Sequence, residues 1–310
     1  MTDHTPVLRD KVVRLLTPRP DGVIVDGTVG LGGHAEAFLA AEPTGRLIGI
    51  DRDPVALDRA RERLIRFGSR ATLVHGSYRD LDRLLDELVV DRIDGLLLDL
   101  GVSSLQLDDA SRGFSFRFDG PLDMRADPTS GATAAEWIAS AAQTEIAEVL
   151  ASYGEERYAE RIARAIDEAR RREPIATTGA LAAIVRTAVP AGYRRGRIDP
   201  ATRTFQAIRI RINGELDALE GGLRAGFDRL AHGGVLVVIS FHSLEDRLVK
   251  RFFREKAADC VCPPELPECV CGKRVEAEVL TNRPVTPTTN EIEANPRARS
   301  AKLRAARKVV

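Results

Sequence analysis

Short apolar runs alternate with amphipathic segments through the first hundred residues of the chain. Four of these runs have the length and composition of buried strands, and they lie at 23–26, 47–51, 71–75 and 93–100. Helical periodicity follows the first three runs, from about residue 34, at 54–67 and at 81–88. Repeated strand–helix units at this spacing predict an α/β fold with a doubly wound, Rossmann-like parallel sheet, whose ligand binds at the carboxyl ends of the strands.

The alternation stops after residue 100. Residues 105–130 are rich in Asp, Gly, Ser and Phe and predict a loop, and Thr133-Ala134-Ala135-Glu136 then fits a capping box. Helical patterns with no strand pattern between them follow at 133–151, 155–172 and 178–189. We therefore predict an all-helical insertion after the fourth strand, at 105–197, inside a discontinuous domain made of 1–104 and 198–310.

Strand and helix patterns alternate again after the insertion. A long helix is predicted from Asp199-Pro200, with a weak point at Asn213-Gly214. A buried strand follows at 234–241, and Ser243 is the expected N-cap of the next helix. Two further strands are predicted at 274–280 and 301–308.

The composition is that of an ordinary globular protein, with 44% hydrophobic and 30% charged residues in a chain of 310. No apolar run approaches the length that crosses a bilayer, and the stretch MTDHTPVLRDK lacks the apolar core of a signal peptide. We therefore expect a cytoplasmic protein with no membrane association.

The net charge is zero, but the basic residues gather in two places. Residues 186–211 hold seven arginines and a single acid, Asp199, while residues 296–310 hold six Lys or Arg and no acid. Clusters of this kind are either solvated faces or contacts for a polyanionic partner such as nucleic acid. The composition leaves both interpretations open.

Four glycines separate the first strand from the helix that follows it. Gly30-Leu31-Gly32-Gly33-His34-Ala35 matches the dinucleotide pattern, and Asp51 falls where a ribose-binding acid is expected. Four residues, Asp26 to Val29, intervene before this match, so the loop is longer than the dinucleotide loop. Bare backbone and a ribose-binding carboxylate suit S-adenosylmethionine equally well, so an oxidoreductase and a methyltransferase both remain possible from this loop.

Polar or aromatic groups also follow the other predicted strands. Asp51 ends the second strand, Tyr78 follows the third, where its ring can cover an adenine, and Asp99 ends the fourth. The carboxyl ends of parallel strands meet at one edge of a sheet, so these side chains are expected to lie together. Their combination favours S-adenosylmethionine over a dinucleotide.

The chain also resembles a known family in many separate blocks. They are HTPVL (4–8), DGTVGLGGH (26–34), IDRDP (50–54), LLLDLGVSSLQLDDASRGFSFRFDGPLDMR (96–125), YGEER (153–157), PATRTFQAIRIRIN (200–213), ISFHSLEDRLVKRFF (239–253) and NPRARSAKLRAARK (295–308). In these blocks the sequence is similar to the ribosomal RNA small subunit methyltransferase H family. The resemblance implies a class I S-adenosylmethionine-dependent methyltransferase fold with a helical substrate-recognition domain inserted after strand four. It also implies methylation of the N4 amino group of a cytidine in the decoding region of small-subunit (16S) ribosomal RNA.

The resemblance further implies which residues bind the methyl donor. These donor-binding positions are Gly32, Gly33, His34, Asp51, Tyr78, Asp99 and Gln106. Many amino-methyltransferases also carry an Asp/Asn-Pro-Pro-aromatic turn after strand four, but this chain has Asp99-Leu100-Gly101-Val102 there. That motif therefore names no catalytic residue here. The candidate contacts to the target base are Ser240, His242 and Asn213, with Phe241 available to stack on the base.

The expected partner is the RNA of an assembled or nearly assembled small ribosomal subunit. Eight basic residues are candidates for contacts to its phosphates, namely Arg194, Arg195, Arg197, Arg203, Arg297, Arg299, Lys302 and Arg304. A non-catalytic ribosome-assembly factor that keeps a vestigial donor pocket is the alternative from another class. Labelled methyl transfer separates the two.

All four cysteines of the chain lie in one short segment, as Cys260-Val261-Cys262 and Cys269-Val270-Cys271. A cytosolic setting argues against disulfides. Two thiol pairs across a proline-rich loop resemble a structural zinc site, although a spacing of one residue is tighter than usual. A loop of reduced thiols without metal is the equally weighted alternative.

Overall fold

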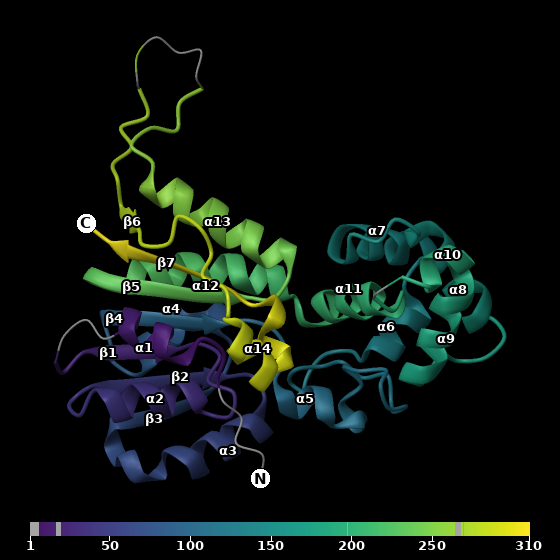
Figure 1. Ribbon diagram of the computed structural model, residues 1–310, viewed down its shortest axis with the longest axis horizontal. Helices are drawn as coiled ribbons and strands as arrows, with labels where there is room; N and C mark the ends of the chain where they lie inside the picture. The colour runs from purple at the N-terminus through teal and green to yellow at the C-terminus, as the bar shows by residue number, and fades with distance from the viewer. Residues whose placement is uncertain (1–5, 17–19, 197, 264–267, 269) are drawn as a thin grey trace. The chain divides into compact units, whose positions relative to one another are not determined.

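The computed structural model describes residues 6–16, 20–196, 198–263, 268 and 270–310. The chain divides into two compact units (Figure 1). The sheet unit comprises Met1–Gly101 and Leu216–Val310, and the helical unit comprises Val102–Glu215. Two residues singled out above, Arg197 and Cys269, lie outside the described residues.

The sheet unit is built on a seven-stranded sheet with the order β3-β2-β1-β4-β5-β7-β6. The strands are β1 (Val23–Asp26), β2 (Arg46–Asp51), β3 (Ala71–His75), β4 (Ile93–Asp99), β5 (Leu230–Ser240), β6 (Ala277–Val279) and β7 (Lys302–Lys308). The first five are parallel to one another, whereas β7 runs antiparallel between β5 and β6. The predicted Rossmann-like parallel sheet is thereby confirmed, with an antiparallel strand added near one end.

Helices cover both faces of this sheet. They are α1 (Arg9–Leu16), α2 (Gly33–Ala41), α3 (Pro54–Leu64), α4 (Leu81–Glu87), α12 (Glu215–Arg229), α13 (Ser243–Ala257) and α14 (Thr289–Ala294), with short 3-10 turns η1 (Ile65–Arg70), η2 (Tyr78–Asp80) and η4 (Pro296–Ser300). Alternate residues of β4 face opposite cores, because Leu96 and Leu98 pack with α4, α12 and α13, whereas Leu97 packs with α1, α2 and α3. Burial on both faces explains the continuous apolar runs in the sequence.

The helical unit contains α5 (Ser104–Asp108), η3 (Ala110–Arg112), α6 (Ala134–Ser140), α7 (Gln143–Gly154), α8 (Ala159–Arg170), α9 (Thr178–Ala188), α10 (Ala191–Arg194) and α11 (Ala201–Asn213). Its core is separate, with Trp137 and Leu150 packing against Phe205 and Ile208 of α11. Helix α11 therefore belongs to this unit, although the sequence pattern assigned it to the sheet domain. Gly214, with φ of +57°, ends α11 at the boundary between the units.

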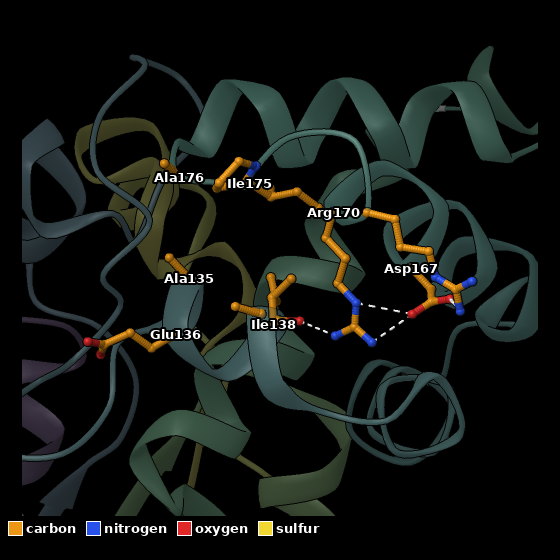
Figure 2. A pocket seen from close by; sticks show the side chains of 10 residues that line it. Ala135, Glu136, Ile138, Asp167, Arg170, Ile175 and Ala176 are labelled. Carbon is orange, nitrogen blue, oxygen red and sulfur yellow. Dashed lines mark hydrogen bonds and ion pairs between the residues drawn. The ribbon is translucent and has the colours of Figure 1, made fainter.

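One expected helix is two helices. The pattern predicts a single helix over 133–151, but Ala141 and Ala142 adopt extended backbone between α6 and α7. Arg170 of α8 donates hydrogen bonds to the carbonyls of Ile138 and Ala141 at the end of α6 (Figure 2). These carbonyls would otherwise lack partners in a helix that stops there, so a side chain about thirty residues away stabilises the break. The predicted capping box at Thr133 and Glu136 is confirmed.

No helix among the described residues is both long enough and apolar enough to span a membrane.

Candidate functional site

Three carboxylates meet at one edge of the sheet. Asp26, Asp51 and Asp99 are the last residues of β1, β2 and β4, which are adjacent and parallel. The register pairs Asp26 with Gly49 on one side and with Leu97 on the other, so the three strands end almost level. The topology therefore brings together the acids that the sequence placed at strand ends.

Asp51 fixes the glycine loop that follows β1. Its Oδ2 accepts a hydrogen bond from the backbone N–H of Gly30 at 2.8 Å, and its Oδ1 accepts one from the N–H of Asp53 at 2.9 Å. Burial raises the pKa of Asp51, while these two hydrogen bonds oppose the rise. Each carboxylate oxygen keeps a further lone pair, so the side chain can still accept hydrogen bonds from a ribose diol.

Asp26 is the most buried of the three acids, at 2% exposure. Its Oδ1 accepts hydrogen bonds from the backbone N–H and the hydroxyl of Thr28, at 3.1 and 3.4 Å. Burial raises the pKa of Asp26 to about 7, and the nearby His34 lowers it in part. This carboxyl is thus close to half ionised at neutral pH.

Thr28 links two of the acids, and no motif in the sequence singled it out. Its hydroxyl oxygen accepts a 2.7 Å hydrogen bond from the backbone N–H of Asp99 while the hydroxyl donates to Asp26. The glycine loop is therefore tied both to β2, through Asp51, and to β4, through Thr28. A threonine inside a loop after a strand is the signal that could have revealed this role.

His34 and Asp99 face one another at the start of α2. The Nε2 of His34 lies 3.5 Å from Oδ2 of Asp99, at the limit of a hydrogen bond. Neither ring nitrogen of His34 nor Oδ1 of Asp99 has a hydrogen-bond partner in the part of the chain that the structure describes, although all three atoms are buried. Buried polar atoms without partners are costly unless a ligand or water satisfies them, so this pair is a candidate binding site.

The glycines of the loop serve different purposes. A Cβ at Gly33 would lie 2.6 Å from Pro6 of the preceding segment, so a side chain there is excluded by packing. Gly32 is the N-cap of α2 with φ of +78°, which a glycine adopts without strain. At Gly30, with φ of +50°, the nearest atom to such a Cβ would be the Thr28 carbonyl oxygen at 3.7 Å. Of these three glycines, Gly30 therefore leaves the most space beside its backbone for a ligand.

Tyr78 and Gln106 are more buried than the sequence suggested. The Tyr78 ring is 8% exposed and packs against Gly222 of α12, where a Cβ would lie 2.5 Å from the ring. Gln106 belongs to the helical unit, and its Oε1 accepts a 3.1 Å hydrogen bond from the N–H of Ser103 in a capping box. Their assignment to the donor stays a prediction.

Two of the three proposed target contacts lie at the end of β5, and one of their atoms, Nε2 of His242, is buried without a hydrogen-bond partner among the described residues. The hydroxyl of Ser240 is 2% exposed and donates to the carbonyl of Lys302 in β7 at 3.3 Å. His242, not Ser243, is the N-cap of α13, so the predicted cap was wrong. Its Nδ1 accepts from the N–H of Glu245 at 3.5 Å, and its Nε2 lies 3.1 Å from Oε1 of the same residue.

Phe241 lies between these two residues and is half-buried. A Cβ at Gly101, which has φ of +106°, would lie 3.2 Å from the ring. The ring therefore packs against the turn after β4, and its stacking on a base stays a prediction.

The third proposed target contact, Asn213, is a structural residue of the helical unit. Its Nδ2 donates to the carbonyls of Met124 and Arg209 at 2.8 and 2.9 Å, and its Oδ1 accepts from the N–H of Ala126 at 2.8 Å. Met124 has φ of +63°, so Asn213 holds the strained part of the long loop against α11.

The basic residues are less available than their clustering suggests. Arg304 was expected to bind RNA, but it is 7% exposed and its Nε donates to Oδ1 of Asp246 in α13 at 2.6 Å. The expectation was therefore wrong for this residue. Lys302 is also paired with Asp246, at 3.5 Å. Of the eight candidates for phosphate contacts, the exposed ones among the described residues are Arg194, Arg195, Arg203, Arg297 and Arg299.

A pocket of about 570 Å³ lies in the helical unit, beside α6 and α8 (Figure 2). Three charged residues of its lining form ion pairs with one another, because Asp167 lies 2.7 Å from Arg170 and 2.6 Å from Arg171. None of the site residues expected from the sequence lines this pocket.

The chain matches known proteins over nearly its whole length. A family model described as the MraW methylase family matches residues 1–309. Relatives named ribosomal RNA small subunit methyltransferase H include those of Syntrophotalea carbinolica, 52% identical over 99% of this chain and 98% of the relative, and Geobacter sulfurreducens, 53% identical over 99% of each. A solved rRNA methylase from Streptococcus thermophilus is more distant, at 12% identity and a TM-score of 0.43, covering 97% of this chain and 94% of its own. The chain therefore belongs to the MraW methylase family, and it is a methyltransferase.

Proposed function

We propose that this enzyme transfers a methyl group from S-adenosylmethionine to N4 of a cytidine in the decoding region of small-subunit ribosomal RNA. The observation that carries the proposal is a family match that spans 1–309, together with buried polar atoms at the strand edge that have no hydrogen-bond partner among the described residues. The name of the relatives supports ribosomal RNA of the small subunit as the substrate. The choice of cytidine N4 rests on the resemblance of the motif blocks, above all 96–125.

The residues at the strand edge fit the methyl donor. S-adenosylmethionine supplies a methyl group on a positively charged sulfur. Asp51 would accept hydrogen bonds from the ribose hydroxyls, and the backbone at Gly30 leaves room for close approach. Asp99 Oδ1 is a buried acceptor without a partner among the described residues, so we assign it to the amino group of the donor's amino-acid end. Gly32, Gly33, His34, Tyr78 and Gln106 complete the proposed donor set.

The chemistry at the target needs positioning more than a strong base. The lone pair of the cytosine N4 amine is delocalised into the ring, so acceptors that hold its hydrogens favour the pyramidal geometry of attack. The proton becomes acidic once the nitrogen is methylated, and in-line placement supplies much of the acceleration. A paired base must also leave its stack before it can react. Ser240, His242 and Asn213 are the proposed contacts for this task, and each also makes a structural contact of its own.

The substrate is proposed to be an assembled or nearly assembled small subunit. A helical unit of this size is large for recognising one base, and exposed arginines on it, Arg194, Arg195 and Arg203, suit phosphate contacts. Phosphate contacts carry little sequence information, so selectivity would come from the shape of the RNA and from the flipped base. The proposal implies a cytoplasmic enzyme, because small subunits assemble there.

The test is mass spectrometry of nucleosides from small-subunit RNA of cells with and without the protein. Loss of N4-methylcytidine is expected, and its return requires the wild-type chain. An Asp99→Ala chain that folds normally but does not restore the nucleoside separates an enzyme from an assembly factor, because the latter needs no donor site. Loss of a 5-methyl or 2′-O-methyl nucleotide instead would refute the N4 assignment. Equal methylation of a short unstructured oligonucleotide and of the purified subunit would refute the proposed substrate.

A further inference from the structure

Three cysteine thiols converge in the segment that joins α13 to β6. The Sγ atoms of Cys260, Cys262 and Cys271 all lie within 4.8 Å of one another, and those of Cys260 and Cys271 are 3.9 Å apart. Figure 1 shows this segment leaving the end of α13 as an extended loop and returning to β6. No step of the proposed methyl transfer uses these thiols.

The spacing of the sulfur atoms suits a shared metal ion. Thiolates bound to Zn²⁺ at about 2.3 Å in a tetrahedron lie about 3.8 Å from one another, close to the Cys260–Cys271 separation. Thiolate ligands also select zinc over magnesium or calcium, which prefer oxygen. We propose that Cys260, Cys262 and Cys271 bind one structural Zn²⁺ ion. Cys269 lies outside the described residues, so the proposal rests on three thiols.

The base of the loop is fixed independently of the metal. The N–H of Glu276 donates to the carbonyl of Lys256 at 2.8 Å, and the Lys256 ammonium lies 2.7 Å from the Glu276 carboxylate. Lys273 pairs with the other oxygen of Glu276. These contacts hold the two ends of the segment together, so Cys271 on one arm is brought close to Cys260 and Cys262 on the other by contacts that need no ion.

Local contacts also suit a thiolate cluster. The N–H of Cys262 donates to Sγ of Cys260 at 3.4 Å, and hydrogen bonds of this kind stabilise the negative charge of sulfur bound to a metal. The apolar side chains between the thiols do not form a core, because Val261 is 56% and Val270 is 78% exposed. Burial of these two side chains therefore does not order the loop around the thiols, whereas a bound metal ion supplies order in many small motifs.

The first test measures the metal content of the full chain, purified under reducing conditions without chelator. About one equivalent of zinc per chain is expected. Cys260→Ser and Cys271→Ser should each lower the zinc content severalfold, while the matched variants Val261→Ser and Val270→Ser, which change neighbouring exposed side chains, should keep it. Less than a tenth of an equivalent, with no uptake of added Zn²⁺, would overturn the proposal, as would iron in place of zinc.

The second test locates the ion. Replacement of zinc by Co²⁺ should give a thiolate-to-cobalt charge-transfer absorption in the wild-type chain and in Val261→Ser, and the absorption should weaken in each cysteine variant. Cobalt that binds without this absorption would place the metal elsewhere and refute the assignment. Circular dichroism on each variant shows whether the sheet unit is still folded, so a loss of metal cannot be mistaken for a loss of fold.

Discussion

The carboxylate of Asp51 accepts a 2.8 Å hydrogen bond from the backbone N–H of Gly30, twenty-one residues earlier in the chain. This bond joins the end of β2 to the loop that follows β1. The acid proposed to hold the donor's ribose therefore also holds the loop against which the donor would lie. Asp51 is therefore expected to determine both the conformation of the loop after β1 and the affinity for the methyl donor.

Replacement of Asp51 should consequently reduce donor affinity, by an amount that depends on the substituted residue. Asp51→Ala removes the acceptors for the ribose and for Gly30, and the removal of each charge-assisted hydrogen bond costs about 1.5–3 kcal/mol. Asp51→Asn keeps a neutral acceptor, so its loss of affinity should be smaller. Calorimetric titration with S-adenosylmethionine measures both, with Asp58→Ala, an exposed acid on α3, as the control. Unchanged affinity in Asp51→Ala would contradict the site.

Stability should depend on pH through Asp26. Folding raises the pKa of this acid from 3.8 to about 7, so the native state holds the proton more tightly than the unfolded chain does. The contribution of Asp26 to the free energy of unfolding is therefore greatest below pH 3.8, and it falls as the pH rises toward 7. At higher pH the native state contains a buried charge.

The Asp26→Asn variant isolates this effect, because its side chain can still accept from Thr28 but does not ionise. Relative to wild type, the variant should gain about 2–3 kcal/mol of unfolding free energy between pH 5 and pH 8. The titratable groups that face Asp26 are His34, Asp51 and Asp99. They are present in both the wild type and the variant, so the difference in unfolding free energy between the two proteins removes most of their contribution. Urea unfolding at the two pH values measures it. A difference that does not change with pH would show that Asp26 is ionised throughout.

His242 should behave as a helix cap, and the same substitutions test its proposed contact to the base. His242→Ala should lower the unfolding free energy by about 1 kcal/mol, whereas His242→Asn should recover most of it because Asn is a favoured N-cap. Methyl-transfer activity should follow the same order. If His242→Asn were as stable as wild type yet inactive, the imidazole would have to contact the substrate.

The two kinds of arginine should respond differently to substitution. Loss of Arg194 and Arg195 together, both exposed, should weaken RNA binding and reduce the slope of log K against log salt by about 0.7–0.9 for each phosphate that is no longer neutralised. Arg304→Ala should lower stability, because Asp246 loses its 2.6 Å partner in a largely buried position. Filter binding across a salt series and thermal unfolding distinguish the two results. Donor affinity of the Arg194/Arg195 variant serves as the control and should not change.

The alternation of strands and helices from β1 to β4 could be predicted because it depends on local periodicity, whereas α1 and α14 were not predicted. The meeting of Asp26, Asp51 and Asp99 could be predicted as well, since parallel strands share a carboxyl edge. The break between α6 and α7 could not, because the side chain that stabilises it, Arg170, comes from another helix.

The N-cap of α13 could not be predicted from the local sequence either. Ser243 with Asp246 and His242 with Glu245 both place a capping residue three positions before an acid. Arg304 binds Asp246, which leaves Glu245 to accept the backbone N–H groups of Phe241 and His242. The position of the N-cap therefore depends on Arg304, which lies fifty-eight residues after Asp246, and a local sequence pattern cannot predict it.

The interruption of the sheet unit also has a consequence for folding kinetics. Strands β4 and β5 are hydrogen-bonded neighbours, yet the 114 residues of the helical unit (102 to 215) lie between them in sequence. Closing a flexible loop of that length costs about 2 kcal/mol more than closing one of ten residues. If the helical unit, whose contacts are local, folds first, it removes most of that entropy before the strands meet. Pulse-labelled hydrogen exchange should then protect α7, α8 and α11 before β4 and β5.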